Sequence, residues 1–178
     1  NIGASQDFGS VLKAAELLKE HTHIHFVIVG NGRAREWVEA QIAERGLQHS
    51  VHCVGSYPLE AMPATFAKAD VLFAALKDEP IFALTVPAKI QAYMSSGRPI
   101  VTMINGEAME LVREVGCGEA VAAEDAEAFA AAILRMSQLS GEERRSMGER
   151  GKNFAAENFD FTRQMTLLEE IMDSDDEK

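Results

Sequence analysis

The segment VPAKIQAYMSSGRPIV, residues 86–101, places a proline and a single lysine at the start of an expected helix. Pro87 suits the first helical turn, where its missing N–H costs nothing, and Thr85 can accept a hydrogen bond from the free amides of that turn. Gly97 is a usual helix stop. Because helix N-terminal amides and an ammonium both attract anions, Lys89 and its neighbours predict a phosphate site.

The same segment also has a purely structural interpretation. Ile90, Tyr93 and Met94 recur at helical spacing and predict a core helix over 86–96, with Lys89 in solvent and Tyr93 packed. In the phosphate interpretation, the lysine is a mobile point charge that neutralises an oxyanion without fixing its geometry. The local residues leave both interpretations open.

A glycine-rich turn is the second candidate. Gly30-Asn31-Gly32-Arg33 follows an apolar run and precedes a helical pattern, a position where glycine lets a backbone approach a ligand closely. The turn lacks the third glycine of the dinucleotide fingerprint, and no acid closes the next strand as that fingerprint requires. A plain strand–helix connection is therefore the alternative.

Two polar loops follow later strands. Lys77, Asp78 and Glu79 come directly after the apolar run DVLFAA, and Asn105-Gly106 follows the run IVTMI. The carboxyl ends of parallel strands meet at one edge of a sheet, so both loops are expected near a ligand there. The alternatives are a charged surface loop and a glycine turn before the next helix.

Metal and nucleophile chemistry have little support in the sequence. The stretch HTHIH at 21–25 puts three histidines on one face of a strand, but no carboxylate or thiol completes a metal site. Cys53 and Cys117 lie in apolar contexts without metal-type spacing, as free thiols in a reducing cytosol do. The sequence contains no G-x-S-x-G elbow.

The elements that must position these residues alternate along the chain. Apolar runs predict strands at 24–29, 51–54, 70–75, 99–104 and 117–122, and helical periodicity predicts helices at 9–20, 34–45, 59–68, 86–96, 107–115, 125–137, 141–157 and 162–172. Continuous apolar strands separated by helices indicate a parallel sheet covered on both faces. We therefore expect an α/β fold, a doubly wound Rossmann-like sheet with its ligand at the carboxyl ends of the strands.

The composition is that of a globular protein and excludes some partners. The 178 residues carry a formal net charge of -11, and LEEIMDSDDEK at 168–178 supplies six of the acids. This balance argues against nucleic acid, which needs clustered lysine and arginine. No apolar run approaches the roughly 20 residues of a membrane span, and no signal peptide is present, so we expect a cytoplasmic protein. The chain begins at NIGAS without methionine, and we expect it to be cut from a longer polypeptide.

Four stretches carry a family resemblance. They are FVIVGNGRAREWVEAQIAERGLQHSVHCVG at 26–55, ADVLFAAL at 69–76, PAKIQAYMSSGRPIVTMINGEAMELVREVGCGEAV at 87–121 and MGERGKNFAAENFDF at 147–161. In this order they resemble the C-terminal domain of a family 4 glycosyltransferase with the GT-B fold. The P-x-K-I-x-x-Y-M-x-x-G-R-P run is typical of bacterial members that build surface polysaccharides, and the resemblance covers nearly the whole chain.

The resemblance implies that the chain binds the nucleotide-sugar donor, expected to be a UDP-sugar, while a missing N-terminal domain binds the acceptor. Catalysis is typically independent of metals and cofactors, because positive charge and helix-terminal amides stabilise the departing diphosphate. It assigns Lys89 to that charge and Glu79 to contact with the sugar. Donor contacts are expected from Gly30, Asn31, Gly32, Arg33, Tyr57, Lys77, Thr85, Pro87, Ala88, Lys89, Ile90 and Tyr93.

The sequence departs from the family's pattern at three places. Alanine stands at position 92, where many relatives carry an acid that holds the ribose hydroxyls. The arginine and lysine that relatives carry near the start of the domain have no clear match, and Gln6 and Asp7 stand near the lysine's place. The spacing from Glu79 to the following helix differs from that of the family's E-x7-E motif.

We therefore predict a donor-binding domain over residues 1–172, followed by an acidic tail at 173–178. The predicted activity is transfer of a hexosyl or acetamidosugar group to a growing bacterial glycan or lipid-linked acceptor. The isolated chain is expected to be inactive, and the longer enzyme to be cytoplasmic or peripheral at the cytoplasmic membrane. The alternatives are a GT-B nucleotide-sugar 2-epimerase, which needs acid–base groups in the cleft, and a non-catalytic α/β interaction module such as a receiver-like domain.

Overall fold

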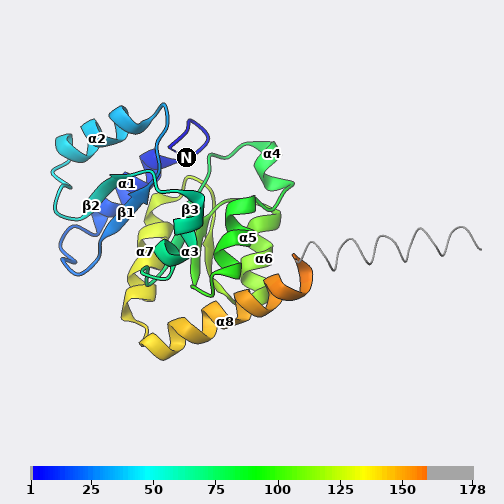
Figure 1. Ribbon diagram of the computed structural model, residues 1–178. Helices are drawn as coiled ribbons and strands as arrows, with labels where there is room; N and C mark the ends of the chain where they lie inside the picture. Colours follow the sequence, from blue (N-terminus) through cyan, green and yellow to red (C-terminus); the bar gives the residue numbers. More distant parts are fainter. Residues whose placement is uncertain (1, 160–178) are drawn as a thin grey trace, which may run out of the picture.

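The computed structural model describes residues 2–159, which form alternating helices and strands (Figure 1). In chain order these are α1 (Phe8–Leu17), β1 (Phe26–Val29), α2 (Arg35–Glu44), β2 (Val51–Gly55), the 3-10 turn η1 (Leu59–Ala61), α3 (Met62–Phe66), β3 (Leu72–Ala75), α4 (Pro80–Ala83), α5 (Ala88–Ser95), β4 (Ile100–Met103), α6 (Glu107–Val115), β5 (Gly118–Val121), α7 (Ala126–Gln138) and α8 (Gly141–Asn158). None of these described helices is both long and apolar enough to cross a membrane. The predicted helix at 162–172 and the tail at 173–178 lie outside the described residues.

The strands pair in parallel, which confirms the predicted fold class. Phe26 of β1 lies opposite Val51 of β2, and β4 lies between β3 and β5, with Ile100 opposite both Leu72 and Gly118. β4 is buried at all four of its positions, and the continuous apolar run that such burial requires makes it easy to locate in the sequence.

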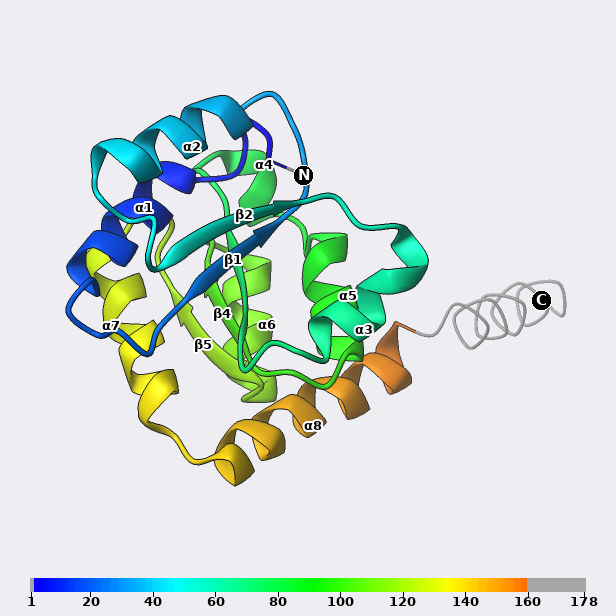
Figure 2. The ribbon, with the colours of Figure 1, turned by 60° about the vertical axis from the view of Figure 1, so that its left-hand side comes forward.

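The hydrogen bonds divide the strands into two sheets, whereas the sequence predicts one. The first has the order β1-β2 and the second the order β3-β4-β5. Figure 2 shows β1 and β2 side by side, apart from the other strands. Within residues 2–159, no strand pairs with the second edge of β1 or of β3 apart from an isolated bridge between Gln6 and Leu76.

Helices cover both faces of the strands, as a doubly wound fold requires. One core joins α1 and α7 to β1 and includes Leu12, Phe26 and Phe129. The other joins α5 and α6 to β3 and β4 and includes Ile90 and Ile100. Helix α8 packs along α5 and α6 and closes this second face (Figure 1).

The segment 76–84, predicted as a loop, contains the short helix α4. Pro80 occupies its first turn, where the missing N–H is not needed. One helical turn offers too little periodicity to be recognised in the sequence.

A capping box fixes the start of α8. The Ser140 hydroxyl accepts a hydrogen bond from the Glu143 N–H at 3.2 Å, and the Glu143 carboxylate accepts one from the Ser140 N–H at 2.8 Å. These hydrogen bonds hold the pKa of Glu143 below its ordinary value. The box satisfies two amides that would otherwise lack partners.

Ser140→Ala is therefore expected to lower the free energy of unfolding by about 1 kcal/mol. In a chain of this size that corresponds to a fall in Tm of about 2–4 °C, measured by circular dichroism. Ser56→Ala, in the exposed loop after β2, is the control and should leave Tm unchanged. Equal effects of the two substitutions would show that the box contributes nothing.

Candidate functional site

Residues 2–7 run along the carboxyl ends of both sheets. The Ile2 N–H donates to Asn31 O at 2.9 Å, just beyond β1. The Asp7 N–H donates to Ala75 O, and the Lys77 N–H donates to Ser5 O, at the end of β3. The loop of residues 2–7 therefore connects the carboxyl ends of β1 and β3, the edge at which open α/β sheets bind ligands.

Lys89 stands in the first turn of α5 beside this loop. Its ammonium donates to the Gln6 side-chain oxygen at 2.7 Å, a contact between residues far apart in the sequence. No carboxylate of the described residues forms an ion pair with it. Burial lowers the pKa of Lys89, and no opposite charge compensates that effect. A partly desolvated cation without a counter-ion is well placed to bind an anion.

The backbone at the start of α5 differs in detail from the sequence prediction. Pro87 is predicted to lie in the first helical turn, but it is the N-cap residue, one position before the helix begins at Ala88. No side chain caps the helix. The prediction that Thr85 caps it is wrong, since its hydroxyl donates to Ile81 O at 3.4 Å instead. The Ala88 and Lys89 amides at this end have no partner among the described residues, and Ala88 is exposed.

Two predicted donor contacts on α5 lie largely inside the protein. Ile90 is fully buried, and its N–H donates to Pro87 O at 2.8 Å, so it offers a ligand neither side chain nor amide. The Tyr93 ring packs edge-on against Phe66 of α3 at 5.2 Å, and burial raises its pKa to about 12. The structural interpretation of the helix thus holds for these two residues, and the anion interpretation of Lys89 stays a prediction.

The glycine turn lies at the carboxyl end of β1. Gly30 has a φ of 141°, and its N–H donates to Gly55 O at 2.7 Å, which ties the turn to β2. The Asn31 side chain accepts from the Gly32 N–H at 2.9 Å. Arg33 is exposed beside the turn and lines a shallow pocket with Asn31 and Gly32. The turn therefore presents an arginine and backbone groups to solvent at the ligand edge.

The loops after β3 and β4 are joined by a polar network. Asn105 donates to the Asp78 carboxylate at 2.8 Å and accepts from the Ala123 N–H at 3.0 Å. The Glu124 carboxylate accepts from the Asp78 N–H at 3.2 Å, and Glu124 has a φ of 63°. No motif in the sequence marks Glu124; its positive φ, unusual for a residue other than glycine, becomes visible only in the backbone.

The side chains of Lys77 and Glu79, at the same edge, form no hydrogen bond or ion pair with other residues of the range 2–159. Lys77 and Glu79 are exposed, and Glu79 is the N-cap residue of α4. At Gly106 the space is taken by protein, because an added Cβ would lie 2.0 Å from Ala83 O. The glycine therefore lets α4 approach and opens no room for a ligand.

Tyr57 and two of the histidines, His23 and His25, line a cavity that Lys89 also lines. Tyr57 follows β2 and is 48% exposed. His25 stacks on His52, with two ring nitrogens 3.3 Å apart. No group of three metal-ligating side chains assembles within the described part of the chain.

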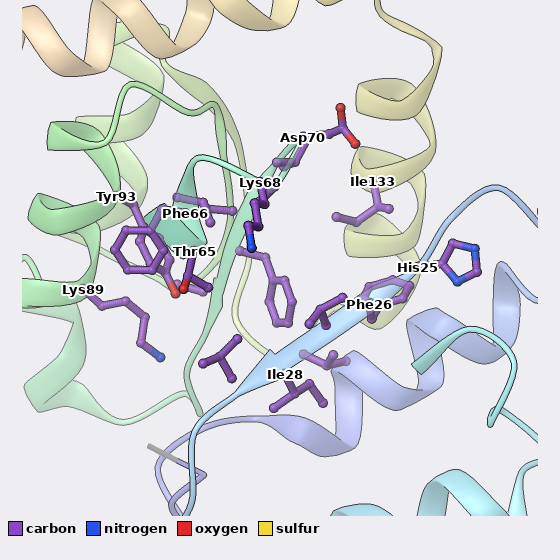
Figure 3. Close-up of a pocket in the computed structure, with 18 of the residues that line it drawn as sticks. His25, Phe26, Ile28, Thr65, Phe66, Lys68, Asp70, Lys89, Tyr93 and Ile133 are labelled. Carbon is purple, nitrogen blue, oxygen red and sulfur yellow. The ribbon is translucent and has the colours of Figure 1, made fainter. Parts of the chain in front are cut away.

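A cavity of about 1030 Å³ extends from the loop of residues 2–7 into the body of the domain. Lys89 points from α5 toward it, Phe26 and Ile28 line it from β1, and Ile133 lines it from α7 (Figure 3). Gln6 and Lys89 line it at the carboxyl edge, and other polar residues, among them His25, Lys68 and Asp70, line it elsewhere (Figure 3).

Residues 5–138 match the model of a protein family described as glycosyl transferases group 1. The curated protein "Amylovoran biosynthesis glycosyltransferase AmsK" from Erwinia amylovora is 27% identical over 132 residues. The match covers 73% of this chain and 32% of AmsK, so the chain spans about a third of the length of this relative.

Solved GT-B glycosyltransferases share the fold. HepE from Anabaena, in complex with UDP and glucose, superimposes with a TM-score of 0.80 at 18% identity, over 98% of this chain and 46% of HepE. The C-terminal domain of the group 1 family glycosyl transferase LpcC from Francisella tularensis gives 0.70 at 18% identity, over 89% of this chain and 84% of that one. At these identities the likeness establishes the architecture.

Proposed function

The chain belongs to the group 1 glycosyltransferases, and we propose that it is the donor-binding domain of an enzyme that transfers a sugar from a nucleotide diphosphate. The observation that carries the proposal is the ammonium of Lys89, partly buried and without a carboxylate partner in residues 2–159, beside the free first-turn amides of α5. These groups lie at the sheet edge where doubly wound folds bind ligands.

The proposed chemistry is electrostatic. As the bond between the sugar carbon and the diphosphate oxygen breaks, negative charge accumulates on the departing diphosphate. Lys89 and the α5 amides stabilise that charge, and they require no reorganisation at the moment of reaction. The acceptor hydroxyl oxygen forms the new bond to the same carbon, and its proton passes to the departing diphosphate or to water. The protein groups in this scheme need no metal or cofactor.

Gln6 helps to explain why the charge comes from α5. The family resemblance places a lysine of relatives near residues 6 and 7, where this chain carries Gln6 and Asp7. Asp7 caps α1 instead, accepting from the Ser10 N–H at 3.1 Å. The ammonium of Lys89 reaches the Gln6 side chain. We infer that the cation of the diphosphate site is delivered here from a different element.

The rest of the donor is assigned by position. We propose that Gly30 and Gly32 let the backbone approach the nucleotide or sugar, that Lys77 and Arg33 add positive charge, and that Glu79 contacts the sugar. Tyr57, exposed beyond β2, is the proposed contact for the base.

The donor is proposed to be a UDP-sugar, consistent with UDP in the HepE complex. A hexosyl or acetamidosugar is transferred to a growing bacterial glycan or lipid-linked acceptor, as the polysaccharide named for AmsK suggests. The acceptor site belongs to an N-terminal domain of the longer polypeptide, so residues 1–178 alone bind donor without turnover. The whole enzyme acts in the cytoplasm or at the inner face of the membrane.

Titration of the chain with UDP and with GDP, followed by backbone NMR, tests this proposal. UDP at millimolar concentration is expected to shift the amides of residues 30–33 and 85–90 and to leave those of 21–25 unchanged. Larger shifts with GDP would reassign the base. Unchanged amides around Lys89 with both nucleotides would overturn the site.

A further inference from the structure

Two of the proposed donor contacts, Lys77 and Glu79, lie on an exposed loop that their own side chains do not hold in place. Neither side chain forms a hydrogen bond or ion pair with another residue of the range 2–159. Exposed loops move readily unless hydrogen bonds tie them to more rigid elements. The positions of both side chains therefore depend on what holds the backbone at Asp78, the residue between them.

Asp78 is held from two neighbouring loops. Its carboxylate accepts a hydrogen bond from the Asn105 side chain at 2.8 Å, and its N–H donates to the Glu124 carboxylate at 3.2 Å. Asn105 follows β4 and Glu124 follows β5, and these two strands are the next ones after β3 in the sheet order β3-β4-β5. The loops that follow three adjacent strands are thus joined at one residue, across the carboxyl edge of the sheet.

Asn105 uses both ends of its side chain in this arrangement. Its nitrogen donates to Asp78, and its oxygen accepts from the Ala123 N–H at 3.0 Å. A carboxylate at this position has no hydrogen to donate, and an apolar side chain can make neither bond. The half-buried carboxamide of Asn105 therefore connects the loop after β3 to the loop after β5.

The backbone of Glu124 makes the loop after β5 a firm support. Glu124 has a φ of 63°, the one positive value outside glycine within residues 2–159. Such a conformation is costly and persists where the surroundings hold it. Here the Glu124 carbonyl oxygen accepts from the Ser10 hydroxyl of α1 at 3.4 Å, and α7 begins directly afterwards at Ala126. The second partner of Asp78 is therefore attached to two helices of the core.

We propose that Asn105 is a positioning residue for the donor. By holding Asp78 against the loops after β4 and β5, it fixes where Lys77 and Glu79 stand at the carboxyl edge, and it acts through them without touching the donor itself. The roles of Lys77 and Glu79 rest on the proposed function. The restraint on residues 77–79 needs no ligand and is measured separately.

Asn105→Leu is the test variant, because it removes both hydrogen bonds of the carboxamide without changing the net charge. The matched rescue combines Asn105→Asp with Asp78→Asn. This double variant exchanges donor and acceptor, so the amide now at position 78 donates to the carboxylate at position 105, which still accepts from the Ala123 N–H. The parent and both variants carry the same charge. Circular dichroism gives the Tm of each, and all other measurements are made well below the lowest Tm.

Amide hydrogen exchange measures the restraint without donor. Asn105→Leu is expected to speed exchange of the amides of residues 77–79 about fivefold, the effect of one hydrogen bond of ordinary net strength, and the double variant should restore the parent rates. None of these three amides donates to Asn105, since their acceptors are Ser5 O, the Glu124 carboxylate and Lys77 O. Faster exchange therefore reports a loosened loop. Faster exchange at Ala123 alone would overturn the proposal.

Titration with UDP measures the effect on the donor site. Asn105→Leu is expected to weaken UDP binding about fivefold, the upper range for an exposed charge pair, and the double variant should recover the parent affinity. In a Lys77→Met background, Asn105→Leu should weaken UDP binding no further, because it acts through that lysine. A lower Tm with unchanged UDP affinity, or losses that add, would make Asn105 a structural residue and overturn the proposal.

The two measurements separate this proposal from the proposed function. A parent chain that does not bind UDP would overturn the donor site, and with it the role of Lys77 toward a donor. The exchange rates would still decide whether Asn105 holds residues 77–79 in place. A parent chain that binds UDP, with equal exchange rates and equal affinities in the parent and Asn105→Leu, would leave the donor site standing and overturn the role of Asn105.

Discussion

Lys89→Met is expected to lower kcat of the complete enzyme by about 100-fold, because one fixed group that stabilises transition-state charge contributes on that order. The diphosphate gains charge as the sugar departs, so the lost interaction is stronger in the transition state than in the bound donor. For this reason kcat should fall more than KM rises. Initial rates over a range of donor concentrations, together with UDP titration of this chain, measure both effects.

Two comparisons separate this loss from a folding defect. Lys19→Met removes one exposed positive charge near the far end of α1 and should leave turnover unchanged. Lys89→Met should be at least as stable as the parent near neutral pH, because it removes a partly buried cation without a counter-ion. A variant that loses both activity and Tm would indicate that Lys89 is a structural residue. Full activity would remove it from the mechanism.

The pH dependence of Lys89 has opposite signs for binding and for stability. Burial lowers its pKa in the folded chain below the ordinary lysine value of 10.5. UDP affinity should therefore fall as the pH rises through that lowered pKa, since the ammonium is lost. Between the two pKa values the unfolded chain binds more protons, so this residue's contribution to stability rises with pH. Lys89→Met should remove both dependences.

The strands could be predicted from the sequence because each of them is marked by a run of apolar residues that are neighbours in the chain. The run at 24–29 is almost wholly apolar and gives β1, and the run at 70–75 gives β3 in the same way. Asn105-Gly106 likewise ends where α6 begins at Glu107. These features depend on neighbours within a few residues, which the sequence shows directly.

The site could be predicted only in part because its contacts are long-range. Lys89 was predicted as an anion ligand, but its partner Gln6 is 83 residues away. The Asp78–Glu124 contact spans 46 residues and has no motif. The division into two sheets could not be predicted from the sequence either. It depends on which strands are neighbours, and adjacency in the chain does not determine adjacency in a sheet.

The second prediction concerns Gly148→Ala, for which helix propensity and the structure predict opposite changes in stability. It lies inside α8, where helix propensity favours alanine over glycine by roughly 1 kcal/mol. In the structure, a Cβ at this position would lie 2.0 Å from Gly97 O and 2.6 Å from the Gly97 carbonyl carbon, both backbone atoms. The contact lies where α8 packs against the end of α5. Neither backbone segment can move away without displacing a helix.

Gly148→Ala is therefore expected to destabilise the domain by about 2 kcal/mol, because the usual cost of overpacking is larger than the gain in helix propensity. Thermal unfolding should show a fall in Tm of roughly 4–8 °C. Gly141→Ala, in the first turn of the same helix, is the matched control, because no atom lies within 4 Å of its added Cβ. It should be neutral or slightly stabilising. If Gly148→Ala instead raised Tm as much as Gly141→Ala, propensity alone would govern the helix, and α8 could not pack so closely on the turn after α5.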